Sequence, residues 1–148
     1  MFRLFFLISV LSISNATAFV IWPNINSPCN TTLQSCIDNS PDGEYIEIRT
    51  NDLIDESILT TNTISLVAGN GYKPVFSQGN NVSIRTFSTT NQIISVKGLT
   101  FLGGHIEYIH RGSANTTLYI TNNDIQSGAP PSAIRIQLYS NAELTANV

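Results

Sequence analysis

SVKGLTFLGG (residues 95–104) and YITNNDIQSG (residues 119–128) align without a gap, and this pair of segments decides the fold. One constant offset brings three pairs into line: Val96 with Ile120, Phe101 with Ile125, and Gly104 with Gly128. One coil of about two dozen residues cannot bury its own apolar side chains, so successive coils must stack about 4.8 Å apart. The repeat therefore predicts a solenoid, in which each coil contacts only its neighbours.

The same period is expected to continue toward the end of the chain and to drift near its start. Leu144 follows Ile120 at the same offset, and Asn147 follows Asn123 at that offset too. Upstream, the step from Ile48 to Leu66 is shorter and the step from Leu66 to Val96 is longer, as expected when loops lengthen on one side of the coils. We therefore expect Val96, Ile120 and Leu144 to form one inward row.

Alternation of apolar and polar residues predicts five strands. These are EYIEIR (44–49), TISLVAG (63–69), IISVKGLTF (93–101), TLYITNNDI (117–125) and NAELTANV (141–148). In the first of them, Ile46 and Ile48 are expected to point inward. Gly or Asn follows each strand, where the backbone must bend. Asn tolerates a left-handed backbone there and can hydrogen-bond to an Asn one coil away.

A short helix over residues 31–39 is predicted to cover the open first rung of the solenoid, whose unpaired strand edges need protection. Asn30 or Thr31 can begin this helix, and an extended lead-in over residues 19–28 precedes it. Its apolar face consists of Leu33, Cys36 and Ile37, and the turn Pro41-Asp42-Gly43 ends it.

The two cysteines, Cys29 and Cys36, leave two interpretations open. Within one helix they would lie about 10 Å apart, which exceeds the limit of about 7 Å on the Cα separation of a disulfide. A disulfide therefore requires Cys29 to precede the helix and fold back along it. The alternative is a pair of small, partly buried apolar residues.

Residues 1–18 have the pattern of a secretory signal peptide. Arg3 supplies a basic start, residues 4–13 form an apolar run, and Ala16-Thr17-Ala18 offers a cleavage site. A buried N-terminal helix is the alternative, because the run is shorter than the roughly 20 residues of a membrane span. The formal net charge of −3 becomes more negative once Arg3 is removed, which argues against nucleic acid and anionic membranes as partners.

CNTTLQSCIDNSPDGEYIEI (29–48) resembles the N-terminal cap and first strand of bacterial secreted parallel β-helix proteins of the pectate-lyase-like superfamily. SLVAGNGYKPVF (65–76) resembles their second rung, and ISVKGLTFLGG (94–104) resembles one of their PbH1-type repeat coils. The resemblance covers residues 29–148 and implies an all-β, right-handed parallel β-helix with a short N-terminal capping helix. That superfamily includes lyases, hydrolases and adhesins, so the resemblance points to carbohydrate without fixing an activity.

No residue is predicted to be catalytic, to bind a cofactor or to ligate a metal. A calcium-dependent lyase would need carboxylates stacked between coils and a base to take a proton. Asp52, Asp55 and Glu56 instead lie in one segment after the first strand and are expected to form a solvated acidic loop. Asp124 is the only acid in the regular repeats, and the aligned coil has Thr100 in its place.

GGHIEYIHRG (103–112) is predicted to be a loop between two coils. His105 and His110 have side chains that can act as general bases, and the neighbouring Arg111 can bind a carboxylated sugar. No acid or nucleophile is tied to these residues by its spacing, so a plain loop is favoured over an active site. Trp22 is expected to pack against the cap, although Trp and Tyr rings can also stack on sugars.

These features predict a signal peptide (1–18), a lead-in and cap (19–43), and β-helix coils (44–148) that are truncated at the C-terminus. The expected protein is secreted, periplasmic or at the cell surface, and acts as a non-catalytic module that is structural or binds polysaccharide or a cell-surface glycan. The alternative is the N-terminal part of a polysaccharide lyase or glycoside hydrolase whose catalytic coils lie beyond residue 148. In either case we expect the chain as given to have no lyase activity on pectate or alginate.

Overall fold

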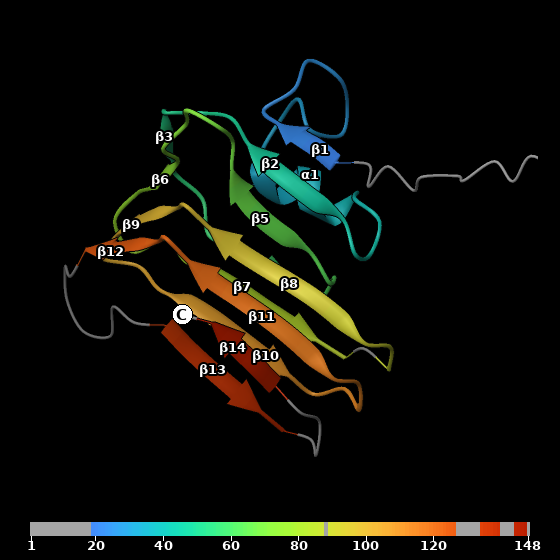
Figure 1. Ribbon diagram of the computed structural model, residues 1–148. Helices are drawn as coiled ribbons and strands as arrows, with labels where there is room; N and C mark the ends of the chain where they lie inside the picture. The colour runs from blue at the N-terminus through green and yellow to red at the C-terminus, as the bar shows by residue number, and fades with distance from the viewer. Residues whose placement is uncertain (1–18, 88, 127–133, 140–143, 148) are drawn as a thin grey trace, which may run out of the picture.

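The protein is an all-β parallel solenoid of about five turns, as the sequence repeat predicts (Figure 1). A computed structural model describes residues 19–87, 89–126, 134–139 and 144–147. The predicted signal peptide (1–18) and Gly128 of the repeat lie outside the described residues. Every strand pair in the described chain is parallel, and the handedness implied by the resemblance stays a prediction.

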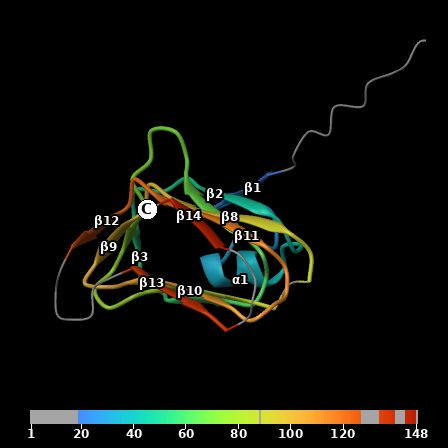
Figure 2. The ribbon, with the colours of Figure 1, turned by 60° about the horizontal axis from the view of Figure 1, so that its bottom comes forward.

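Three sheets form the walls of the solenoid, and the chain visits them in turn (Figures 1 and 2). Sheet A contains β1 (Phe19–Trp22), β2 (Tyr45–Ile48), β5 (Ser65–Ala68), β8 (Gln92–Lys97), β11 (Thr116–Thr121) and β14 (Leu144–Asn147) in that spatial order. Sheet B contains β3 (Leu53–Ile54), β6 (Val75–Phe76), β9 (Thr100–Leu102) and β12 (Asp124–Gln126). Sheet C contains β4 (Ile58–Thr60), β7 (Val82–Thr86), β10 (Ile106–His110) and β13 (Ile134–Leu138).

The register confirms the central part of the repeat. Val96 pairs with Ile120 across β8 and β11, and Leu66 pairs with Val96 across β5 and β8. In sheet B, Phe101 of β9 pairs with Ile125 of β12. Val96 and Ile120 are buried in the core, where Ile and Val side chains of successive coils close one apolar row.

The register at both ends of sheet A differs from the prediction. Leu144 pairs with Thr116 rather than with Ile120, so it does not continue the row of Val96 and Ile120. Asn147 pairs with Tyr119 rather than with the bend at Asn123. In the first coil, Leu66 pairs with Ile46, and Ile48 pairs with Ala68. Each of these errors is a shift by two or by four positions, and an even shift keeps the same side of a strand facing inward.

Two of the predicted strands are each divided by a bend. Residues 93–101 form β8 and β9 with Gly98 between them at φ 74°, and residues 117–125 form β11 and β12 with Asn122 at φ 57°. The expected left-handed Asn is thus found at Asn122. The expected hydrogen bond between Asn side chains is wrong at this bend, because Asn123 bonds to backbone instead. Its Oδ1 accepts from Leu99 N at 3.0 Å, and its Nδ2 donates to Val96 O at 2.8 Å.

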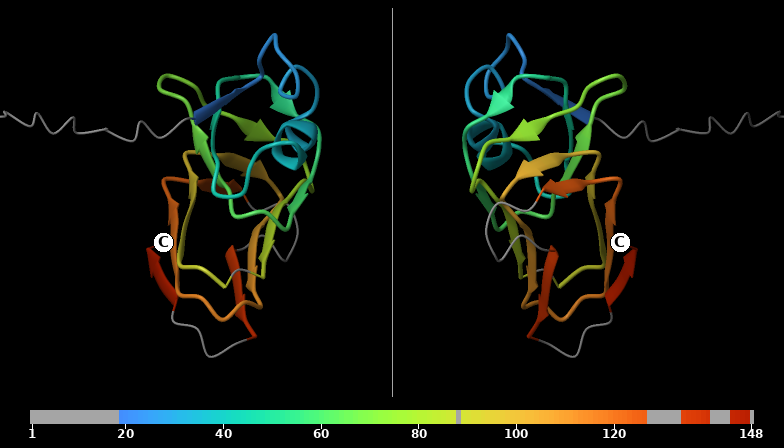
Figure 3. Two further views of the ribbon diagram at one scale, coloured as in Figure 1. Left: turned by 90° about the vertical axis from the view of Figure 1, so that its right-hand side faces the viewer. Right: turned by 90° about the vertical axis from the view of Figure 1, so that its left-hand side faces the viewer.

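The predicted cap is present as α1 (Leu33–Asp38), a helix slightly shorter than expected. Its N-cap is Thr32 rather than Asn30 or Thr31, and Thr32 Oγ1 accepts a hydrogen bond from Ser35 N at 3.0 Å. Viewed along the solenoid axis, α1 lies inside the outline of the three sheets (Figure 2), and it lies at the end opposite β13 and β14 (Figure 3). Its buried residues are Leu33, Cys36 and Ile37.

Cys29 and Cys36 form a disulfide, which settles the two interpretations left open by their spacing. Cys29 precedes the helix and folds back, so the Cα atoms are only 4.3 Å apart. The lead-in adds a further strand, β1, which pairs with β2 and covers its edge. Trp22 on this strand donates from Nε1 to Thr31 O at 3.0 Å, so it packs beside the cap as expected. Within the described ranges, no helix is long and apolar enough to span a membrane.

Candidate functional site

The segment from 103 to 112, predicted to be a loop, contains the strand β10. Ile106–His110 lies between β7 and β13 in sheet C, with Tyr108 paired to Ile84 on one side and to Ile136 on the other. All five residues of β10 are buried, so the strand lacks the alternation of exposure seen in sheet A. The prediction was wrong because Glu107 and His110 are both buried despite being polar, and therefore hide the two-residue period.

Side chains on the outer side of sheet C line up across neighbouring coils. Ser83, Glu107 and Arg135 share one row, and Arg85, Ile109 and Gln137 share the next. The backbone pairing continues one residue past the strands, since Arg111 N donates to Thr86 O and Tyr139 N donates to His110 O. A third row therefore consists of Phe87, Arg111 and Tyr139. We call these three rows the sheet C face.

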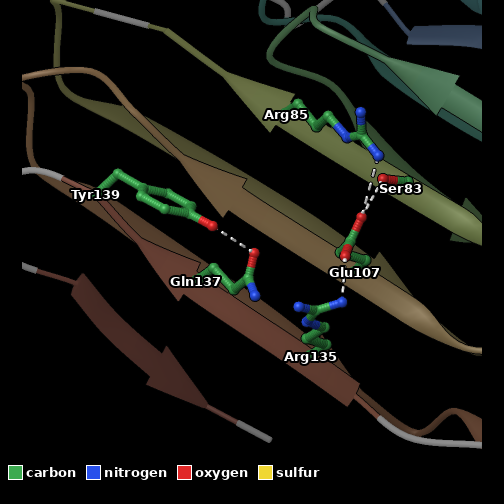
Figure 4. A network of polar contacts seen from close by, with 6 residues as sticks. All are labelled: Ser83, Arg85, Glu107, Arg135, Gln137 and Tyr139. Atoms are coloured by element: carbon green, nitrogen blue, oxygen red, sulfur yellow. Dashed lines mark hydrogen bonds and ion pairs between the residues drawn. The ribbon is translucent and has the colours of Figure 1, made fainter. Parts of the chain in front are cut away.

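Glu107 is the centre of a polar network on the sheet C face (Figure 4). Its Oε2 accepts a hydrogen bond from Ser83 Oγ at 2.8 Å and lies 3.5 Å from Arg85 Nη2. Its Oε1 lies 3.3 Å from Arg135 Nη1. The carboxylate on β10 is thus held from β7 on one side and from β13 on the other. Glu107 is only 7% exposed, because the side chains of its neighbours cover it.

The surroundings of Glu107 keep its carboxylate ionised. Burial by itself raises the pKa of a carboxyl group, because it removes water from the charged form. The hydrogen bond from Ser83 and the positive charges of Arg85 and Arg135 outweigh burial and lower the pKa of Glu107 below its ordinary value. At neutral pH the carboxylate therefore remains charged and serves as an internal counter-ion for the two arginines.

Arg111 lies between two aromatic rings in the third row. Its Cζ is 5.9 Å from the centroid of the Phe87 ring and 5.0 Å from that of the Tyr139 ring. Both rings are largely exposed, at 57% for Phe87 and 62% for Tyr139. A guanidinium group is attracted to such ring faces, which hold it in place. Among the described residues, no carboxylate forms an ion pair with Arg111.

Gln137 lies between the Glu107 network and the aromatic row and contacts Tyr139 (Figure 4). Its side-chain amide lies 3.1 Å from Tyr139 Oη. With the amide rotated by half a turn, its carbonyl oxygen also accepts from Arg135 Nε at 2.9 Å while its NH₂ group donates to Tyr139 Oη. In that orientation Arg135 is held both by Glu107 and by Gln137 on its own strand.

The structure separates the three residues of the predicted loop. Arg111 is exposed on the sheet C face, whereas His110 is 1% exposed and points into the core. His110 Nδ1 lies 3.0 Å from Thr86 Oγ1 and 3.2 Å from Tyr108 Oη. His105 precedes β10, and its backbone N donates to Asn81 Oδ1 at 2.8 Å. His110 thus belongs to a buried polar cluster and has no access to a ligand on the outer face.

The predicted acidic loop is exposed at Asp52 and Asp55, as expected for a solvated segment, but two of its acids also have a structural role. Glu56 accepts hydrogen bonds from two N–H groups in the first turn of α1, at 2.7 Å from Leu33 N and 3.0 Å from Gln34 N. Asp55 accepts from Ser77 Oγ at 2.5 Å, which ties it to the next coil. Within the part of the chain that the structure describes, no group of three His, Cys, Asp or Glu residues is placed to hold a metal ion.

The outer side of sheet A carries a different surface, an open groove of about 550 Å³ at the start of its strands. Phe19, Tyr45 and Ile93 line it together with Ser65, and Phe19 and Ile93 are more than half exposed. Burial, and to a lesser extent the negative charge of Glu47, raise the pKa of Tyr45. This groove has aromatic and aliphatic walls, but it lacks the converging cationic groups of the sheet C face.

Most residues of the sheet C face were not predicted from the sequence, although the repeat offset relates its residues on β7 to those on β10. VSIRTF (82–87) and IEYIHR (106–111) are separated by the same offset as the two repeat segments. That offset aligns Ser83 with Glu107 and Phe87 with Arg111. Arg135 lies opposite Glu107 at a larger offset, and Tyr139 follows Arg111 at the same larger offset, so a fixed period does not find them.

Comparisons with models of protein families, with curated proteins and with solved structures give no significant match to this chain. The resemblance to pectate-lyase-like proteins therefore has no support beyond the fold itself. The strand pairing and register show a parallel β-solenoid with a short capping helix. The charge, aromatic rings and cross-coil contacts of the sheet C face are the features from which a function can be argued.

Proposed function

We propose that the protein is a secreted or cell-surface, non-catalytic module that binds an acidic polysaccharide through the sheet C face. The observation that carries this proposal is the placement of Arg111 between the exposed rings of Phe87 and Tyr139. Secretion is supported by the leader-like residues 1–18. Carbohydrate as the ligand class is supported by the resemblance of the repeat coils to pectate-lyase-like proteins.

The chemistry of the Arg111 row favours a carboxylated sugar. A guanidinium donates two parallel hydrogen bonds to a carboxylate, which is its best-matched anion. The rings of Phe87 and Tyr139 provide flat apolar surfaces on either side, against which the C–H faces of sugar rings can pack. Arg85 and Arg135 add positive charge to the same face, with only Glu107 to offset it among the described residues.

The stacked coils also suit a linear polymer. Equivalent positions in successive coils recur about every 4.8 Å along the solenoid axis. A polymer that lies along this axis crosses β7, β10 and β13 in turn. It therefore runs parallel to the row of Phe87, Arg111 and Tyr139 and can contact these residues one after another. Such a surface gives many weak contacts in series, which is how a repetitive ligand is held without a deep pocket.

A non-catalytic role is supported by the state of Glu107, the acid at the centre of this face. Acid–base catalysis needs a group that exchanges a proton near the working pH. Glu107 is instead bonded to Ser83, Arg85 and Arg135, and its lowered pKa keeps it ionised. The alternative, that the chain is the N-terminal part of a lyase or hydrolase, is tested by assaying for cleavage products in the binding experiment below.

Binding of polygalacturonate at low salt, measured by isothermal titration calorimetry, tests the proposal. Arg111→Gln should weaken binding by about tenfold, since it removes a charge-assisted hydrogen-bond donor pair. Lys97→Gln is the matched control, because it removes the same charge from an exposed site on sheet A and should leave the affinity nearly unchanged. Fully methyl-esterified polygalacturonate should bind much more weakly than the acidic polymer.

Failure of the wild-type protein to bind the acidic polymer would overturn the proposal. Equal weakening by Arg111→Gln and Lys97→Gln would also overturn it, because the attraction would then depend only on net charge. Release of unsaturated or reducing ends from the polymer would favour the enzyme alternative.

A further inference from the structure

The contacts of Glu107 form a complete anion site that is already filled by the protein's own carboxylate. Ser83 and Arg85 reach it from β7, and Arg135 reaches it from β13, while Glu107 itself extends from β10 between them. We call the three donors Ser83, Arg85 and Arg135 the Glu107 seat. We infer that Glu107 is a specificity-determining residue, which occupies this seat and so withholds it from a second anionic group of the ligand.

The strands that carry the donors of the seat are positioned without the Glu107 side chain. Ser83 and Arg85 belong to β7, whose register is set by its backbone pairing with β4 and β10. With the Gln137 amide rotated by half a turn, Arg135 also donates to the carbonyl oxygen of this side chain on its own strand. Removal of the carboxylate should therefore leave three hydrogen-bond donors facing a vacated position. A carboxylate of an external ligand offers the same charge and geometry as the group that was removed.

Glu107 determines how many anionic groups the sheet C face can pair. With Glu107 in place, Arg85 and Arg135 share one internal counter-ion, and Arg111 is the cation with no carboxylate partner among the described residues. A ligand then gains one strong ionic contact, at Arg111. This inference rests on the proposed function for the identity of the ligand. It predicts that the protein binds polymers with widely spaced carboxylates more tightly than densely charged polymers.

The seat itself can be tested without any polysaccharide, by chemical rescue of Glu107→Ala with acetate. The thermal midpoint of the variant should rise when acetate replaces chloride at constant ionic strength, because a ligand that binds the folded state stabilises it. The wild-type protein should show a clearly smaller rise, since its seat is full and acetate can pair only with Arg111 on this face. A variant that responds to acetate no more than the wild type does would overturn the inference.

Glu47→Ala is a matched control for the rescue. Glu47 also accepts a hydrogen bond from an arginine, Arg49, at 2.7 Å, but it lies on sheet A and is held by that one side chain. Removing it leaves the Arg49 side chain and the backbone donor of Asn70 rather than a seat formed by side chains of two strands, so acetate should raise the midpoint less than in Glu107→Ala. An equal rise in both variants would show that any exposed arginine suffices, and would overturn the inference.

The effect on ligand choice is tested with Glu107→Ala, which vacates the seat and leaves Ser83, Arg85 and Arg135 to bind a carboxylate of the ligand. The ratio of the affinities for fully acidic and half-esterified polygalacturonate should increase by about tenfold over the wild type, as expected for one added charge-assisted contact. An unchanged ratio would overturn the role in specificity. If acetate rescues Glu107→Ala but neither polymer binds the wild type, the seat stands and the proposed function fails.

Discussion

The outer faces of sheets A and C have the same strand spacing, but their charges are arranged differently. On sheet A, the ion pair between Glu47 and Arg49 joins two residues of the same coil, and Lys97 lies exposed nearby. On sheet C, the ion pairs of Glu107 with Arg85 and Arg135 join residues of different coils. Cross-coil pairs run along the solenoid axis, so sheet C presents a polar surface that is continuous from one coil to the next.

The inner sides of the two sheets differ as well. The inner side of sheet A consists mainly of Ile, Leu and Val residues that are fully buried. A buried polar cluster lies where the end of β10 in sheet C meets the start of β8 in sheet A, and residues of both sheets form it. Gln92 Nε2 donates to Thr86 Oγ1 at 3.0 Å, and Thr86 in turn contacts Tyr108 and His110. The inner side of sheet A is thus apolar except at the start of β8 and β11, whereas β10 in sheet C carries buried polar residues on both sides, Glu107 outside and His110 inside.

The largest effect is expected from a charge placed on the inner side of sheet A. Ile120→Asp would bury a carboxylate with no partner in an apolar row and should lower the free energy of unfolding by about 3 to 5 kcal/mol. Lys97→Gln, on the outer side of the paired strand, should change it by less than about 0.5 kcal/mol. Urea denaturation followed by circular dichroism measures both. Similar losses in the two variants would contradict the division of sheet A into an inner and an outer side.

The fold of sheet A could be predicted because its residues alternate in burial. β8 and β11 each alternate regularly, and the constant offset of the repeat placed Val96 beside Ile120. The register of β14 could not be predicted, because coil length varies with the loops and every even shift satisfies the same alternation. Sequence pattern therefore determines which side of a strand is buried more reliably than which residue lies opposite.

The sequence pattern did not predict the strands of sheet C, because polar residues of this sheet are buried through contacts with one another. Glu107 and Ser83 lie on the outer side of the sheet but are only 7% and 8% exposed, since they bond to each other. His110 lies on the inner side and is buried in the polar cluster. The alternation of apolar and polar residues along one strand cannot reveal such contacts, because they join residues of different coils. The candidate site thus lies where the simple pattern fails, as is often the case for functional surfaces.

A smaller effect is expected inside sheet C. Thr86→Val keeps the shape of the side chain but removes the hydroxyl that contacts Tyr108, His110 and Gln92. These buried partners lose a hydrogen bond, so the free energy of unfolding should fall by about 1 to 3 kcal/mol. Thr121→Val is the matched control, because Thr121 is half-buried on the outer side of sheet A. Equal stability of the two variants in urea would show that the hydroxyl of Thr86 contributes nothing to the buried polar cluster.

The smallest expected effect is the pH dependence of stability that comes from Glu47 on sheet A and Glu107 on sheet C. The pKa of Glu47 is lowered chiefly by its hydrogen bond from Arg49, and that of Glu107 by Ser83, Arg85 and Arg135 against the opposing effect of burial. A folded-state pKa below the unfolded value of about 4.3 means that ionisation stabilises the folded protein at neutral pH. This stability is complete above the unfolded pKa and is lost as the pH falls through the lower, folded-state pKa.

Gln variants isolate these contributions, because Gln resembles the protonated acid at every pH. Glu107→Gln should be less stable than the wild type at pH 7 by about 1 kcal/mol, and the difference should persist to about pH 5 and then vanish in stronger acid. Glu47→Gln should follow the same course with a smaller amplitude, since Glu47 is held by one arginine side chain and is more exposed. Urea midpoints measured from about pH 7 to about pH 3 give both curves. A larger amplitude for Glu47→Gln would show that a pair within one coil is held as firmly as a carboxylate shared between coils, and would remove the physical basis for distinguishing the two faces.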